Sequence, residues 1–315
     1  MQKAIRAAAL GAAMVAGLAL SGCPVQPSYP STITPVYAAT QAGGLFVYNG
    51  TSWTNYTNAN TGSGLASSAL SSVVVFGSGS GAVVLAGGNA NVSQFNGTAW
   101  TQLTSGLGSA AVHRLVSGSN VYAATSGGLS ILNSDGTTWT NNAAVGSAND
   151  VSTFGAYTYV AADTGLFVYN GTSLVGGAPI PRVTVLPGCT KVTAVFVDSL
   201  GDVIAGTDTG LAVQFGGAGL FISQLPGTPF VNQVTLDARG YLYAATSTGL
   251  YIIGSSAFQI LPTATLCVCV DGAGTIYAGT ATGLQASRNG GLTWTTQLSG
   301  PQVNSVTTTA PLYSF

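Results

Sequence analysis

Side chains that could carry out acid–base or nucleophilic chemistry are scarce in this sequence. Its 315 residues include seven Lys and Arg, eight acidic residues and one His. Every acidic residue is Asp, so Glu is absent as a general acid or base. Charged residues make up 5% of the chain, against about 25% in an average soluble protein. We therefore do not expect an active site built from many converging charged groups.

The arginines beyond the N-terminal segment are the candidates for holding an anionic substrate. Sialidase-like catalysis would need three Arg, a Tyr activated by Glu, and an acid, and the repeat pattern described below divides these arginines between two faces. Two-carboxylate glycosidase chemistry would have to use pairs of Asp. Asp198, Asp237 and Asp271 each open a Gly-containing turn, so we interpret them as caps of their own backbone. The arginines are Arg114, Arg182, Arg239 and Arg288.

The histidine and cysteine positions do not suggest a metal centre. His113 has no Cys or carboxylate at ligand spacing around it, so we expect no metal site and no cofactor. Cys267 and Cys269 point to the same side of one predicted strand and lie too close along the chain for an easy disulfide. Together with Cys189 they are interpreted as small buried hydrophobic residues.

The N-terminus has the organisation of an export signal. Lys3 and Arg6 precede an apolar stretch at residues 7–20, which is too short for a comfortable membrane span. Leu20-Ser21-Gly22-Cys23 follows and resembles the lipobox of bacterial lipoproteins. That resemblance implies cleavage after residues 1–22 and lipid attachment at Cys23, with several acyl chains giving stable anchoring. An ordinary signal peptide with a chance Cys and an uncleaved anchor are the alternatives.

Residues 23–35 form a proline-rich stretch without hydrophobic periodicity, which predicts a stiff, extended tether. The expected location is therefore outside the cytoplasm. The chain would be a lipoprotein of the cell membrane or outer membrane, facing the periplasm or the exterior, with the membrane as its first partner.

One short phrase recurs along the rest of the chain. It consists of an apolar pair, two small residues and usually Thr, then a Gly-Leu a few residues later. The copies are spaced 34 to 48 residues apart, the length of four short strands with their turns. The phrase begins at Val36, Val84, Val121, Tyr159, Val203, Leu242 and Ile276.

The repeat predicts four strands, here called A to D. Strand A is apolar, strand B is the recurring phrase and strand C follows Gly-Leu. Asn-Gly-Thr or Asp-Gly-Thr hairpins then lead to strand D, often at a Trp. We therefore predict that residues 36–315 form an all-β, seven-bladed β-propeller with blades of four antiparallel strands.

The ends of the repeat array predict how the ring closes. The first unit starts at strand B with Val36, and the last complete strand A lies at residues 303–306. We expect this C-terminal strand to join the N-terminal blade, which removes free sheet edges. Residues 312–315 resemble the start of another strand B and would compete with residues 36–39.

The units at residues 192–211, 231–250 and 266–284 resemble the propeller repeats of periplasmic sensor domains in two-component regulators. The stretch from Ser287 to Trp294 resembles the Asp-box of sialidase-like and sortilin-like propellers, with Asn289 where Asp is usual. These resemblances imply the propeller fold over about residues 36–310 but leave the function open. Sensor proteins continue into a membrane helix and a kinase portion, and this sequence has neither after the repeats.

The composition favours a binding module over an enzyme. Without a basic patch, nucleic acid is not an expected partner. Long connections at residues 57–68 and 176–191 predict one binding face for a protein or glycan, because recognition often resides in loops on a rigid scaffold. The alternatives are a carbohydrate-active lyase or glycosidase and a structural member of an envelope assembly. The candidate binding residues are Arg182, Lys191, His113 and Arg114.

Overall fold

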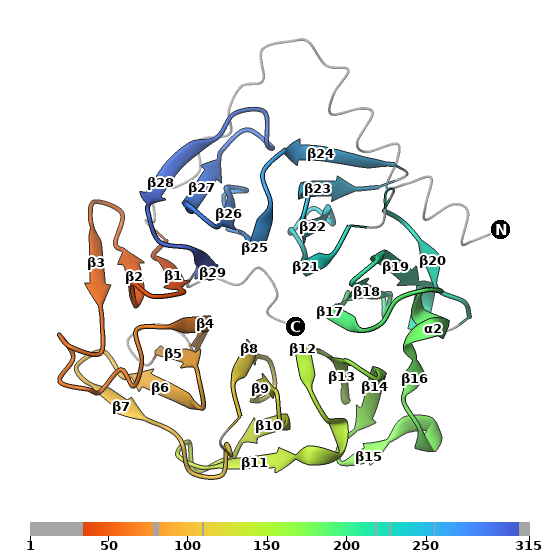
Figure 1. Ribbon diagram of the computed structural model, residues 1–315, viewed down its shortest axis with the longest axis horizontal. Coiled ribbons are helices and arrows are strands. Elements are labelled where there is room, and N and C mark those ends of the chain that lie inside the picture. Colours follow the sequence, from red (N-terminus) through yellow and green to blue (C-terminus); the bar gives the residue numbers. More distant parts are fainter. Residues whose placement is uncertain are drawn as a thin grey trace.

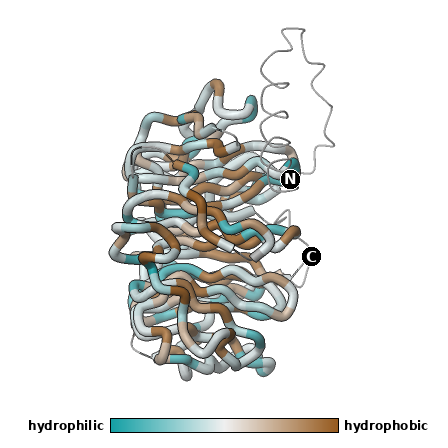
Figure 2. The backbone as a smooth tube through the Cα atoms, turned by 90° about the vertical axis from the view of Figure 1, so that its right-hand side faces the viewer, coloured by the Kyte–Doolittle hydropathy of each residue, from teal (hydrophilic) through white to brown (hydrophobic). Residues whose placement is uncertain are grey.

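A computed structural model describes residues 34–77, 82–108, 110–217, 219–225, 227, 229–254 and 256–308. Within them the chain forms seven antiparallel sheets arranged in a ring, as predicted (Figure 1). Seen edge-on, the ring is a disc whose hydrophobic residues follow the strands (Figure 2). The export signal, Cys23 and the competing segment at residues 312–315 lie outside the described residues.

Each blade runs from strand A at the central axis to strand D at the rim (Figure 1). Blade 1 contains β29 (Val303–Thr308), β1 (Val36–Thr40), β2 (Leu45–Tyr48) and β3 (Trp53–Tyr56). Blade 2 contains β4 (Leu70–Phe76), β5 (Val83–Gly88), β6 (Asn91–Phe95) and β7 (Trp100–Gln102). Blade 3 contains β8 (Val112–Ser117), β9 (Val121–Thr125), β10 (Gly128–Leu132) and β11 (Trp139–Asn142), followed by the 3-10 turn η2 (Ala143–Val145).

The remaining blades follow the same order. Blade 4 contains β12 (Ala148–Phe154), β13 (Tyr157–Ala162), β14 (Gly165–Asn170) and β15 (Ser173–Leu174). Blade 5 contains β17 (Val192–Val197), β18 (Val203–Thr207), β19 (Gly210–Gln214) and β20 (Ile222–Ser223), with η4 (Phe215–Gly217) before β20. Blade 6 contains β21 (Val231–Leu236), β22 (Leu242–Thr246), β23 (Gly249–Ile253) and β24 (Ala257–Leu261). Blade 7 contains β25 (Thr265–Val270), β26 (Ile276–Thr280), β27 (Gly283–Ser287) and β28 (Thr295–Ser299).

The ring closes between the two ends of the repeat array. Strand β29 pairs antiparallel with β1, with Ala38 opposite Val306 and Val36 opposite Thr308. The predicted closure, in which a C-terminal strand A completes the N-terminal blade, is confirmed. It gives the first blade its inner strand, so β1 is paired on both sides and the two ends of the repeat array are joined in one sheet.

The recurring Thr and Gly of the repeat build the turn from strand B to strand C. In blade 3 the Thr125 hydroxyl donates to the carbonyl of Gly128 at 2.9 Å, and the same bond forms at Thr207, Thr246 and Thr280. Gly128 has φ of +133°, and a Cβ atom there would lie 2.3 Å from the carbonyl oxygen of Asn142 in strand D. The glycine is needed because backbone approaches too closely for any side chain.

Small residues in strand B allow the blades to pack face to face. Ala123, Ala124, Ala244 and Ala245 are fully buried. A Cβ atom on Gly279 of blade 7 would lie 2.7 Å from the carbonyl oxygen of Val303 in blade 1, so this close packing extends to the last blade. The core is therefore a series of apolar layers between adjacent blades, each held mainly by hydrophobic burial.

Blade 4 departs from four regular strands, because a fifth strand, β16 (Ile180–Pro181), also pairs with β14. Strand β15 stops after two residues at η3 (Val175–Gly177), and the chain then forms β16 and the short helix α2 (Arg182–Val185). Gly176 and Gly177 both have positive φ, which explains why the strand cannot continue there. Among the described residues, no helix is both long and apolar enough to cross a membrane.

Candidate functional site

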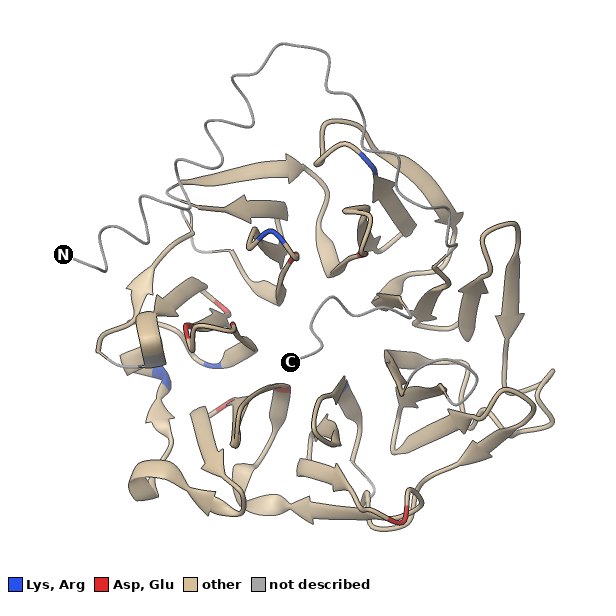
Figure 3. Ribbon diagram, turned by 180° about the vertical axis from the view of Figure 1, so that it is seen from behind, with Lys and Arg blue, Asp and Glu red and all other residues tan. Residues whose placement is uncertain are grey.

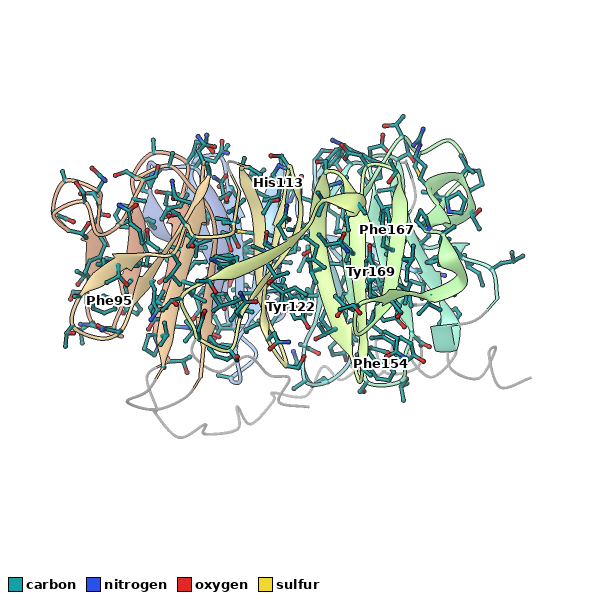
Figure 4. All side chains as sticks on the ribbon, turned by 90° about the horizontal axis from the view of Figure 1, so that it is seen from below. Phe95, His113, Tyr122, Phe154, Phe167 and Tyr169 are labelled. Atoms are coloured by element: carbon teal, nitrogen blue, oxygen red, sulfur yellow. The ribbon has the colours of Figure 1, made fainter. Side chains whose placement is uncertain are left out.

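The disc has two faces with different connections. The loop face carries the B–C turns and D–A connections, and the hairpin face carries the A–B and C–D hairpins. In the edge-on view, His113 near the start of β8 lies toward the loop face, and Phe154 at the end of β12 lies toward the hairpin face (Figure 4). These two faces and the central channel are the surfaces on which function can be sought.

The central channel contains a cavity of about 780 Å³. Its wall consists of strand A residues from six blades, starting at the level of Arg114 and Asp150. From there it extends to the hairpin face, where Gly77 and Gly155 contribute to its lining. The cavity is thus placed on the hairpin-face side of the channel.

Arg114 and Asp150 form an ion pair between blades 3 and 4. Arg114 Nε lies 3.4 Å from Asp150 Oδ1, and their side chains are only 15% and 8% exposed. Asp150 Oδ2 also accepts a hydrogen bond from the backbone N–H of Val195 in blade 5 at 3.1 Å. Burial raises the pKa of Asp150, and the charge of Arg114 opposes that rise. The pair therefore joins three consecutive blades.

Other polar groups of the channel wall also connect neighbouring strands A. The Ser72 hydroxyl oxygen accepts from the N–H of Leu115, and that of Ser305 accepts from the N–H of Val73. Gln233 Oε1 accepts from the N–H of Val268 at 3.0 Å. These groups therefore hold neighbouring strands A together across the boundaries between blades.

His113 belongs to a second set of contacts between blades. Six strands A contain a β-bulge residue whose side chain bonds to the carbonyl of the first residue in the next strand A. His113 Nδ1 lies 2.7 Å from the carbonyl oxygen of Ala148 in this way. Blade 7 has Leu266 at the position, and there Cys267 Sγ lies 3.7 Å from the carbonyl oxygen of Val303. The six bulge residues are Ser71, His113, Asn149, Thr193, Asn232 and Asn304.

The sequence reasoning missed this set of bulge residues. Their side chains are chemically different, so they do not appear as a motif when the repeats are compared. The available signal was their position in the repeat. The second residue of strand A is polar in six of the seven blades.

The four predicted binding residues fall into two separate groups. His113 and Arg114 are neighbours in β8, where both contact the next blade. Arg182 and Lys191 lie on the connection between blades 4 and 5, where Arg182 is the first residue of α2. Only the second group lies in one of the two long connections.

The connection carrying Arg182 and Lys191 folds back over the loop face. Strand β16 pairs with the start of β14, and Arg182 Nη1 donates to the carbonyl of Asp163 at 3.4 Å. Lys191 Nζ lies 5.1 Å from the centre of the Phe230 ring, and Asp208 accepts from the N–H of Thr190 at 2.9 Å. We call this segment, residues 180–191, the loop platform.

The aspartates are used by the fold. The Oδ1 atom of Asp237 accepts from the N–H groups of Arg239 and Tyr241, and Asp198 and Asp271 make the equivalent bonds. Their predicted role as turn caps is therefore confirmed. Every Asp of the chain lies in the described part, and each accepts at least one hydrogen bond there. The five that are not turn caps of this kind are Asp135, Asp150, Asp163, Asp202 and Asp208. Charged side chains are few and are spread around the ring (Figure 3).

The three cysteines outside the N-terminal segment are free thiols. Cys189 and Cys267 are buried, and Cys189 Sγ donates to the carbonyl of Arg182 within the loop platform. Burial raises the pKa of Cys267 to about 12 and that of Cys269 to about 11. Thiols with such pKa values are protonated at neutral pH and are poor nucleophiles.

The C–D hairpin of blade 7 is held together by its own side chains. Asn289 Oδ1 accepts from the N–H of Thr293, and the Ser287 hydroxyl oxygen accepts from the N–H of Gly291. Trp294 Nε1 donates to the carbonyl of Ile260 in blade 6. The tryptophan thus fastens one blade to the preceding one.

No protein-family model and no curated protein sequence matches the chain. Solved structures do share its fold. The extracellular domain of the hybrid two-component system BT4673 from B. thetaiotaomicron has 18% identity and a TM-score of 0.58, covering 73% of this chain and 33% of that chain. PorZ, a surface component of the type-IX secretion system of Porphyromonas gingivalis, has 18% identity and a TM-score of 0.61, covering 81% of this chain and 45% of that one. YCF48 from Cyanidioschyzon merolae has 13% identity and a TM-score of 0.56, covering 74% and 88%.

These similarities define the class of fold. The match to BT4673 agrees with the resemblance of the repeats to sensor propellers. At such low identity it is the propeller architecture that is shared. The chain spans about a third of the BT4673 domain and less than half of PorZ.

Proposed function

We propose that the protein is a lipid-anchored, non-catalytic propeller of the bacterial cell envelope that binds a protein or glycan through its loop face. The observation that carries this proposal is that every acidic side chain is already engaged in a structural contact. Each Asp is engaged in a turn, a hairpin or a contact between blades, and Glu is absent. The carboxylates that general acid–base chemistry would require already have structural partners.

The loop platform supplies the features of a binding surface. It rests on the rigid ring through β16, and it carries Arg182, Lys191 and the exposed side chain of Val183. A platform with two cations next to apolar surface suits a partner with anionic groups and some apolar character. A protein surface and an acidic glycan both fit this description.

Export and anchoring are supported by two independent observations. The sequence ends its N-terminal apolar stretch with the lipobox-like Leu20-Ser21-Gly22-Cys23. Two of the similar propellers, BT4673 and PorZ, are named as an extracellular domain and a surface component. The similarity to PorZ also favours a second candidate function, that of a structural member of an envelope assembly.

Fractionation of the Cys23→Ser variant tests the anchor. The unchanged protein should sediment with membranes and the variant should be released into the soluble extracytoplasmic fraction. If the variant still sediments with the membranes, the lipid anchor at Cys23 is wrong. Chemical cross-linking in intact cells then identifies partners, and a stoichiometric complex with other envelope proteins would favour the assembly role.

A further inference from the structure

We propose that the hairpin face lies against the membrane that holds the lipid anchor, so that the loop platform points away from it. This inference rests on the proposed anchor at Cys23. It assigns a lipid surface as the partner of a face that has not yet been given a role.

Large exposed hydrophobic side chains are distributed unequally between the two faces. Nine such residues are found in the described part of the chain, and seven of them lie at or beside A–B or C–D hairpins. Val175 lies at the outer edge of blade 4, and Val183 is on the loop platform. The seven residues are Phe76, Tyr157, Leu200, Leu220, Ile222, Phe258 and Leu292.

Six of these seven residues form an arc over four consecutive blades. Tyr157 belongs to blade 4, Leu200 to blade 5 and Phe258 to blade 6. Leu292 lies at the tip of the C–D hairpin in blade 7 and is 76% exposed. Single Leu, Phe and Tyr side chains at loop tips are suited to insertion between lipid headgroups, where the apolar part leaves water and the backbone stays solvated.

The tether joins the propeller on the same side. Strand β1 is a strand B, so its first residue, Val36, lies at the hairpin-face end of blade 1. Blade 1 is next to blade 7, which carries Leu292. Residues 23–35 reach about 40 Å when fully extended as polyproline II helix, so the anchor keeps this face near the bilayer.

Charge does not explain the placement of these residues. The hairpin face has both signs: Arg239 is bonded to Asp237, and the exposed Arg288 and Asp135 lie in C–D hairpins. Contact with lipid would therefore depend on apolar insertion. Because salt screens charges and not apolar burial, the contact should be unaffected by ionic strength.

A matched pair of surface positions tests the orientation. Leu200 on the hairpin face and Val183 on the loop platform are 59% and 58% exposed, so labels at both begin equally accessible. The lipidated full-length variants Leu200→Cys, Leu292→Cys and Val183→Cys are each labelled with an environment-sensitive fluorophore. They are inserted into phosphatidylethanolamine–phosphatidylglycerol vesicles that contain a lipid with a nitroxide on its headgroup.

The proposal expects the labels at positions 200 and 292 to lose most of their fluorescence, with the label at position 183 unchanged, at low and high salt alike. Equal quenching at all three positions, or none at any of them on vesicle-bound protein, would overturn the orientation and leave the anchor intact. Protein that fails to associate with the vesicles at all would instead count against the proposed function. The unsubstituted protein, whose remaining thiols have raised pKa values, gives the background of labelling.

Discussion

His113 Nδ1 lies 2.7 Å from the carbonyl oxygen of Ala148, the first residue of strand A in the next blade. Asn149, Asn232 and Asn304 make the same contact from the equivalent positions of three other blades. The only histidine of the chain is therefore one member of a ring of bulge residues that hold neighbouring strands A together. This geometry gives His113 a structural role that does not depend on any ligand.

Replacing His113 should reveal how much one of these contacts contributes. The His113→Ala variant should lower the free energy of unfolding by about 1 kcal/mol, because one hydrogen bond between blades is lost. The His113→Asn variant should remain close to the original protein, since Asn already serves at three equivalent positions. Urea unfolding measures both. Equal stability of all three proteins would show that the contact contributes nothing.

Replacing Gly283, which opens strand C of blade 7, should lower stability for two reasons: its positive φ and the close approach of strand D. The two reasons can be separated. Gly283 has φ of +139°, and a Cβ atom there would lie 2.0 Å from the carbonyl oxygen of Leu298. Gly283→Ala should therefore lower stability by about 3 kcal/mol or more, because strand D must move. Gly290 also has positive φ, +72°, but no atom lies within 4 Å of the place a Cβ would take, so Gly290→Ala should cost about 1 kcal/mol. Thermal unfolding compares them, and similar losses would argue against the close approach.

The hairpin at Asp135 should be sensitive to acid. The Thr138 hydroxyl and then the N–H groups of Thr137 and Thr138 lower the pKa of Asp135 from its ordinary 3.8 to about 2. Since the folded pKa is below the unfolded one, the stabilisation is present above the unfolded pKa and is lost as the pH falls through about 2.

Carboxyl titration by NMR checks this expectation directly for Asp135. The Asp135→Asn variant is the matched control, because Asn49 and Asn96 hold equivalent hairpins with the same backbone contacts. It should be as stable as the original protein at neutral pH and lack this contribution to the acid dependence. A titration of Asp135 at its ordinary pKa would refute the role assigned to Thr138.

The thiols should be unreactive in the folded protein. Burial raises the pKa of Cys267 to about 12 and that of Cys269 to about 11, and burial also raises the pKa of Cys189. In the Cys23→Ser protein, iodoacetamide at pH 8 should modify none of the three before unfolding and all of them in denaturant. Mass spectrometry locates the modified residues. Rapid modification of native Cys267 would show that the interface between blades 7 and 1 opens readily.

The sequence predicted the architecture well because the repeat carries its own physical constraints. Thr125 and Gly128 form a turn in which few other residues fit, so their recurrence marks the end of strand B in most blades. The long connection predicted at residues 176–191 does follow the short strand D of blade 4, but β16 and α2 inside it were not predicted, because Gly176 and Gly177 are equally compatible with an ordinary loop. The contacts of His113 and Arg114 were also missed. These contacts depend on which strand of the next blade lies beside β8, and that neighbour is set only when the ring of blades closes.

The loop platform is the part of the candidate site whose role in binding can be tested by charge removal. The Arg182→Ser and Lys191→Ser double variant should lower cross-linking to the envelope partner several-fold while changing stability by less than about 1 kcal/mol, since each side chain makes one weak contact. Arg288→Ser is the control, because it removes an exposed cation from the hairpin face. Quantitative mass spectrometry of cross-linked complexes from intact cells gives the measurement. If the double variant retains its partner and the Arg288 variant loses it, the binding surface lies on the hairpin face, and both the loop platform and the membrane-facing orientation must be given up.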